Sequence, residues 1–185
     1  SIADYANFAR AFAGIDKAHA LWIPSGPARG VFLSLAGAQG AQVNASDSTY
    51  AALRTALLSY GDPLMPLRMA SYGDARFRCR LAAKVLSGFD SERVLHQVES
   101  RLREHFGFAR RDFGQTVSVD EVAAVAHGIA GVQAVQVTRL YRQGQAAGLV
   151  PRLYAAIPVA SPNSLPQAAE LLTLASAPVE LEVLP

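Results

Sequence analysis

Four basic side chains recur along one short stretch of the sequence and are well suited to bind another molecule. They are Arg76, Arg78, Arg80 and Lys84. Alternate residues of an extended strand point to the same side, and mostly apolar residues separate these four, so they should share one solvent-exposed face. A row of cations attracts carboxylates. We therefore predict a candidate docking face for an acidic partner; an ordinary solvated strand face is the alternative interpretation.

The residue types that catalyse reactions or bind metals occur without a recognisable pattern. Cys79 falls on the apolar side of the same strand, where a thiol without a neighbouring base is inert. Asp112-Phe113-Gly114 matches the metal-binding tripeptide of kinases, but the glycine-rich and catalytic loops that accompany it are missing. We therefore predict no catalytic residue, no cofactor, no metal and no enzymatic activity. The histidines lack zinc-ligand spacing and are expected at or near the surface: His19, His96, His105 and His127.

The composition indicates a globular chain. Of its 185 residues, 51% are hydrophobic and 17% are charged, which is enough apolar material for a real core. A net charge of +2 is too small to argue for a nucleic-acid partner, and no apolar run is long enough to cross a membrane. The single cysteine excludes an internal disulfide and suits a reducing compartment. Because the sequence begins at a helix-capping Ser1 rather than Met, we expect it to be the tail end of a longer protein.

The periodicity of apolar residues predicts a mixture of helices and strands. The helix expected at 48–60 should bury Leu53, Ala56, Leu57 and Tyr60. A second helix should run from 90 or 91 to 105 or 106 and carry an ion pair between Glu99 and Arg103. Strands are expected at 18–23, 30–36, 67–72, 76–86, 134–141, 153–159 and 179–184. This order predicts the α+β class, with two tandem modules at 1–72 and 73–185, each a helix packed on an antiparallel sheet.

The opening segment is echoed late in the chain, which predicts that the two modules are related by an internal repeat. Ser1 aligns with Ser118 and Gly14 with Gly131 at one constant offset. Each copy reads as a serine cap, an amphipathic helix, a glycine stop and an apolar strand. The alternative is that two alanine-rich helices resemble each other by composition alone.

Several segments together resemble a known family. They include the turn Gly61-Asp62-Pro63-Leu64-Met65-Pro66-Leu67, the segment Phe113-Gly114-Gln115-Thr116-Val117, the run Ile129-Ala130-Gly131-Val132 and the opening Ile2-Ala3-Asp4-Tyr5. The chain resembles the C-terminal part of the baseplate J-like proteins, wedge components of contractile phage tails and related injection machines. The resemblance is strongest from Gly61 to Leu140. It implies a structural role, in which wedge subunits pack around a central hub, and it carries over no active-site residue.

Two functions remain open from the sequence. The first is a non-enzymatic wedge or assembly subunit of a contractile phage or prophage tail. It would act through protein–protein packing in the virion baseplate, or in the bacterial cytoplasm during assembly. Its partners would be other baseplate and tail proteins and further copies of the chain, with no nucleic acid and no membrane insertion. The alternative is a free-standing α+β domain that binds a small ligand, which would require a deep pocket with converging polar groups.

Overall fold

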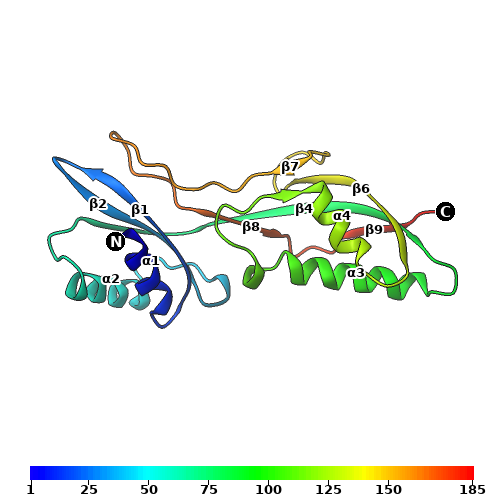
Figure 1. The fold of residues 1–185 in the computed structure, drawn as a ribbon, viewed down its shortest axis with the longest axis horizontal. Helices are drawn as coiled ribbons and strands as arrows, with labels where there is room; N and C mark the ends of the chain where they lie inside the picture. Colours follow the sequence, from blue (N-terminus) through cyan, green and yellow to red (C-terminus); the bar gives the residue numbers. More distant parts are fainter. The chain divides into compact units, whose positions relative to one another are not determined.

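A computed structural model describes residues 1–185, and the chain forms two compact units (Figure 1). Unit 1 comprises Ser1–Gly73 and Ala156–Glu170, and unit 2 comprises Asp74–Ala155 and Leu171–Pro185. Four α-helices and mixed sheets confirm the α+β class. The division into modules 1–72 and 73–185 stays a prediction. The compact units themselves are discontinuous in sequence, because residues 156–170 pack with the first part of the chain.

Unit 1 is a three-stranded sheet with two helices against one face. β1 (Ile15–Ser25) pairs antiparallel with β2 (Ala28–Gly37), and β2 pairs parallel with β3 (Leu67–Ser71). The expectation of a purely antiparallel sheet is therefore wrong. The chain between β2 and β3 forms a short 3-10 turn, η1 (Ala38–Gly40), and the helix α2 (Ser48–Tyr60), and such a crossover returns the next strand parallel.

The two faces of this sheet are covered by different parts of the chain. Leu33 and Leu35 of β2 pack in one core with Ala9 of α1 (Ile2–Ala11) and with Leu53 and Leu57 of α2. Ser34, between those two leucines, points to the opposite face and is fully buried. There its hydroxyl accepts a hydrogen bond of 2.8 Å from the backbone N–H of Ala169. Residues 156–170 therefore reach the face that α1 and α2 leave uncovered.

Unit 2 is organised around the long strand β4 (Gly73–Val85). It pairs antiparallel with β6 (Val132–Arg142) and parallel with β9 (Glu180–Val183), and it also pairs with β8 (Glu170–Leu174). The helices α3 (Ser91–His105) and α4 (Val119–His127) cover one face. A two-stranded ladder joins β5 (Val117–Ser118) to β7 (Arg152–Leu153), and η2 (Phe108–Arg110) follows α3.

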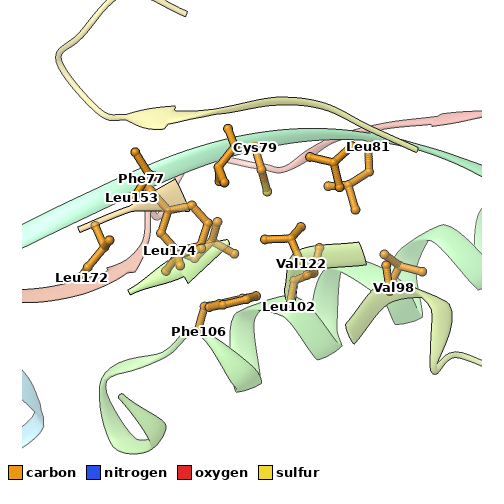
Figure 2. Close-up of a cluster of buried hydrophobic side chains, with 14 of the residues drawn as sticks. Phe77, Cys79, Leu81, Val98, Leu102, Phe106, Val122, Leu153, Leu172 and Leu174 are labelled. Carbon is orange, nitrogen blue, oxygen red and sulfur yellow. The ribbon is translucent and has the colours of Figure 1, made fainter. Parts of the chain in front are cut away.

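The core of unit 2 lies between β4 and these helices. Figure 2 shows Phe77, Cys79 and Leu81 pointing from β4 toward Leu102 and Phe106 of α3. The rings of Phe77 and Phe106 meet edge to face at 5.2 Å between centroids, which is a favoured aromatic geometry. The alternation predicted for this strand is confirmed, because every second side chain from Ala75 to Leu81 is buried.

The helix-to-strand device that suggested a repeat has similar local geometry in both places. α1 and α4 are each followed by a glycine in the left-handed region, Gly14 at φ 89° and Gly131 at φ 92°, and then by a strand. The surrounding sheets differ. β1 is the edge strand of a three-stranded sheet in the order β1-β2-β3, whereas β6 is the edge strand of a sheet in which β4 also pairs with β8 and β9. The internal repeat is therefore not confirmed and stays a prediction.

Candidate assembly surface

The four predicted docking residues lie on β4 with their side chains on the face opposite the core. Arg76 and Lys84 are exposed, and Arg78 and Arg80 are half-buried. Three of the four form ion pairs within the chain. Arg76 contacts Asp74 at 2.7 Å, Arg80 contacts Glu182 at 3.0 Å, and Arg78 lies 3.7 Å from Glu180. The shared basic face is thus present, but its charges are largely matched by carboxylates of the same unit.

The carboxylates that pair with Arg78 and Arg80 come from β9, whose parallel pairing with β4 places them beside the basic row. Glu180 stands opposite Arg80 in the register. It also lies 3.9 Å from Arg139 of β6, so one carboxylate neighbours arginines of two other strands. Lys84 is the member of the row without an ion pair. A partner that uses this face would meet a mixed charge pattern, and its role in docking stays a prediction.

An ion pair on α3 anchors the segment between β8 and β9. The predicted contact between Glu99 and Arg103 is confirmed at 2.8 Å. Arg103 also donates to the carbonyls of Ala175 and Ala177, at 3.0 and 2.6 Å, and Glu99 accepts from the N–H of Val179 at 3.1 Å. Burial opposes ionisation of Glu99, but the bonds from Arg103 and Val179 outweigh it and lower its pKa. These contacts hold the acidic strand β9 where it faces the arginines.

A buried arginine fixes the loop that follows α3. Arg111 is only 1% exposed, and its guanidinium donates to Glu121 at 2.9 Å and to the carbonyl of Thr116 at 2.6 Å. The same carboxylate lies 3.0 Å from His105 Nε2, and the guanidinium carbon lies 5.2 Å from the centre of the Phe106 ring. This cluster ties the loop to α3 and α4. Sequence reasoning missed this cluster, because charged loop residues such as Arg110 and Arg111 show no periodicity that tells which of them is buried.

The remaining candidates for chemistry are structural or isolated. Cys79 is buried among apolar side chains, and burial raises its pKa to about 12, so its thiol is protonated and inert. The His, Cys, Asp and Glu side chains do not gather in a group of three that could hold a metal ion. None of the helices combines the length and apolarity needed to span a lipid bilayer.

A groove of about 290 Å³ lies between α1 and α2. Its lining is mainly aromatic and aliphatic, with Tyr5, Phe8, Leu57 and Tyr60 as its large side chains. The sequence predicted that Tyr60 faces inward, and this is wrong, because Tyr60 is 83% exposed; the centre of its ring lies 6.0 Å from that of Phe8. Ser1 and Asp4, which form an ion pair with each other, also line the groove.

The comparison with protein families bears on the part of the chain that forms this groove. Residues 1–70 match the family model of the baseplate J-like central domain. The resemblance to baseplate J-like proteins is confirmed. A search of the curated proteins gave no match.

The baseplate J-like match runs from residue 1 to residue 70, within β3, and so takes in most of unit 1. Its position differs from the expectation in two respects. The matched region is the central domain of the family rather than its C-terminal part, and it includes only the first ten residues of the stretch where the resemblance was expected to be strongest, Gly61 to Leu140. The match supports a structural role in a phage tail baseplate.

Proposed function

We propose that this chain is a wedge or assembly subunit of the baseplate of a contractile phage tail or related injection system. The single observation that carries the proposal is the baseplate J-like match over residues 1–70. The proposed subunit is not an enzyme, and it acts by packing against other tail proteins and further copies of itself. It would reside in the virion baseplate, or in the bacterial cytoplasm during assembly, and a prophage is a natural source.

The chemistry of the described side chains agrees with this role. The one thiol is buried and protonated, and all three arginines of the β4 face pair with carboxylates of the same unit. In contrast, several large apolar side chains are left in solvent, among them Tyr60, Leu64 and Val159, which are 83%, 88% and 76% exposed. Exposed apolar side chains of this size supply the area that becomes buried when subunits associate.

Co-purification with tail proteins tests the proposal. The chain, carrying an affinity tag, would be co-expressed with the baseplate and tube proteins encoded beside it, and purified tails would be examined by mass spectrometry. We expect a stable complex of fixed stoichiometry and the presence of the chain in the tails. Absence from both would contradict the proposal, as would turnover of a metabolite that a point substitution abolishes.

The contribution of the predicted basic docking face to partner binding can be measured separately from its contribution to folding. Reversal of Arg80 alone would place like charges beside Glu182, which weakens the hold on β9. The double change Arg80→Glu with Glu182→Arg restores an ion pair while it alters the basic row. If the row binds a partner, the double variant should fold normally and still co-purify poorly. Full recovery of co-purification would mean that the single reversal acts only through β9.

A further inference from the structure

The outer face of the unit 2 sheet carries polar side chains of β6 that sequence reasoning did not single out. β6 runs beside β4 (Figure 1), and in their register Arg139 stands directly opposite Arg80, and Tyr141 directly opposite Arg78. Directly opposite residues of neighbouring strands point to the same side of a sheet. Arg78, Arg80 and Arg139, here called the arginine trio, therefore lie together on the face turned away from the core.

The arginine trio surrounds one carboxylate without binding it closely. The shortest distances from a guanidinium nitrogen to a Glu180 oxygen are 3.7 Å for Arg78, 4.0 Å for Arg80 and 3.9 Å for Arg139. A hydrogen bond between such groups spans about 2.7–3.2 Å. Arg80 makes one at 3.0 Å, but with Glu182. Arg78 and Arg139 therefore keep N–H donors that Glu180 does not use.

The charges around the arginine trio do not balance. Two carboxylates, Glu180 and Glu182, stand beside three guanidiniums, so one positive charge is left over. Arg80 and Arg139 are like charges directly opposite each other, which is an unfavourable arrangement. The exposed fractions of the three arginine side chains lie between 36% and 43%, so a partner can reach them. One further carboxylate would balance the charge and offset the repulsion.

The surroundings favour a carboxylate of a protein over a phosphate of a nucleic acid. Glu180 and Glu182 lie along the β9 side of the trio, where they would repel the repeated charges of a phosphate backbone. A single carboxylate carries the one negative charge that the cluster lacks. The planar guanidinium also matches a carboxylate through two parallel hydrogen bonds. Tyr141, opposite Arg78, adds a hydroxyl that can donate to the same ligand.

We propose that Arg78 and Arg139 bind an aspartate or glutamate side chain of a neighbouring baseplate protein, with Tyr141 beside it. This inference deepens the proposed function and rests on it, because it names the chemistry of one partner. It also moves the centre of the docking face predicted from sequence, from the row along β4 to a site between β4 and β6. A partly exposed charge contact of this kind sets orientation and association rate more than affinity.

The first test measures binding of an acidic peptide. The probe is a fluorescent peptide of alternating serine and glutamate, because alternate residues of an extended peptide share one side. The site variant is Arg78→Gln with Arg139→Gln. It removes no hydrogen bond to Glu180, so folding should be unaffected, which thermal unfolding would check. The matched control is Arg93→Gln with Arg101→Gln, which removes the same charge from exposed positions of α3.

We expect the wild type and the control to bind the peptide alike, and the site variant to bind it about tenfold more weakly. A peptide with glutamine in place of glutamate should not bind, and an oligothymidylate of equal charge should bind more weakly than the acidic peptide. Three results would overturn the inference: no binding to the wild type at about 1 mM peptide, equal binding to the site variant, or an oligothymidylate that binds as tightly. The last would mean that the face attracts anions in general.

The second test looks for the carboxylate in the tail complex. Arg139→Lys keeps the charge and introduces an amine, which a carbodiimide joins to a carboxylate in contact with it. We expect a cross-link from this position to an acidic residue of a co-purified tail protein, and none from the control Arg101→Lys. No such cross-link, or equal cross-linking of both, would overturn the inference and leave the proposed function intact. Conversely, a chain that never enters a tail removes the proposed function, and the peptide titration alone then decides whether the site binds a carboxylate.

Discussion

His19 and Ser34 stand directly opposite each other in the β1–β2 pair, on the sheet face that points away from α1 and α2. Ser34 is bound to Ala169, whereas the Nδ1 atom of His19 is buried without a hydrogen-bond partner. Burial lowers the pKa of His19. Protonation of His19 is therefore unfavourable in the folded protein.

The first prediction concerns pH. Because the pKa of His19 is lower in the folded state, the unfolded state binds its proton first, so stability is full above the unfolded value near 6.5 and falls as pH drops below it. Urea unfolding followed from pH 7.5 to 5 should show this decline, and His19→Gln should flatten it. The control His127→Gln, at an exposed histidine, should keep the wild-type slope. Equal slopes in all three proteins would contradict the prediction.

The second prediction compares two arginines of α3. Arg103→Ala removes the hydrogen bonds that Arg103 donates to two backbone carbonyls and to Glu99. We expect the free energy of unfolding to fall by about 2 kcal/mol. Arg101→Ala removes only an exposed pair with Glu104 and should cost under about 0.5 kcal/mol. Thermal unfolding of both variants measures the difference. Similar losses would mean that the anchoring of residues 175–179 contributes little.

The third prediction concerns acid. Since the pKa of Glu99 is lowered in the folded protein, its contribution is present above the unfolded value of 4.5 and is lost as pH falls through the lower folded value. Glu99→Gln should therefore be less stable than the wild type at pH 7, and the difference should shrink as pH falls through the folded pKa of Glu99. A constant difference over this range would show that Glu99 acts through packing rather than through its charge.

The fourth prediction concerns the buried guanidinium. Glu121→Gln leaves Arg111 buried without its counter-charge and should cost about 3–5 kcal/mol. Arg111→Met keeps the apolar volume and removes the buried charge, so it should cost less. Chemical denaturation of the two variants measures both values. If Arg111→Met proves the more damaging change, the hydrogen bond to Thr116 matters more than the ion pair.

The fifth prediction concerns two glycines with similar backbone angles. A Cβ atom on Gly131, at φ 92°, would lie 2.5 Å from Cδ1 of Phe89, whereas one on Gly144, at φ 89°, meets nothing within 4 Å. Gly144→Ala should cost about 1 kcal/mol from backbone strain alone. Gly131→Ala should cost more, and the added Phe89→Ala change should recover the excess. A double-mutant cycle that shows no coupling between the two positions would contradict the clash.

The elements that local pattern determines could be predicted from sequence. α2 has the expected bounds, and the alternation along β4 correctly placed Cys79 in the core. β8 was missed because Glu170–Leu174 is buried on both faces and shows no alternation. The strand expected at 153–159 is wrong beyond Leu153, because the chain after Leu153 is not paired as a strand; Ala156 instead forms hydrogen bonds with the backbone and carboxylate of Glu170.

Features that depend on residues far apart in sequence could not be predicted. The carboxylates that pair with Arg78 and Arg80 lie on β9, about a hundred positions later, and only the fold brings them together. Tyr60 follows the helical spacing of the inner stripe of α2, but nothing beyond Phe8 covers it in unit 1. Periodicity gives the side of an element that should be apolar; it does not tell whether another element packs there.

The chain passes between its units at Gly73–Asp74, at Ala155–Ala156 and again at Glu170–Leu171. A backbone cut at Gly73–Asp74 would leave residues 1–73 attached only through noncovalent contacts, such as the hydrogen bond between Ser34 and Ala169. Expression of residues 1–73 alone would remove residues 156–170, which cover Ser34, and would expose that face of β2 to solvent. A pulling force applied between the units would be shared by three connecting segments of the backbone instead of acting on one linker.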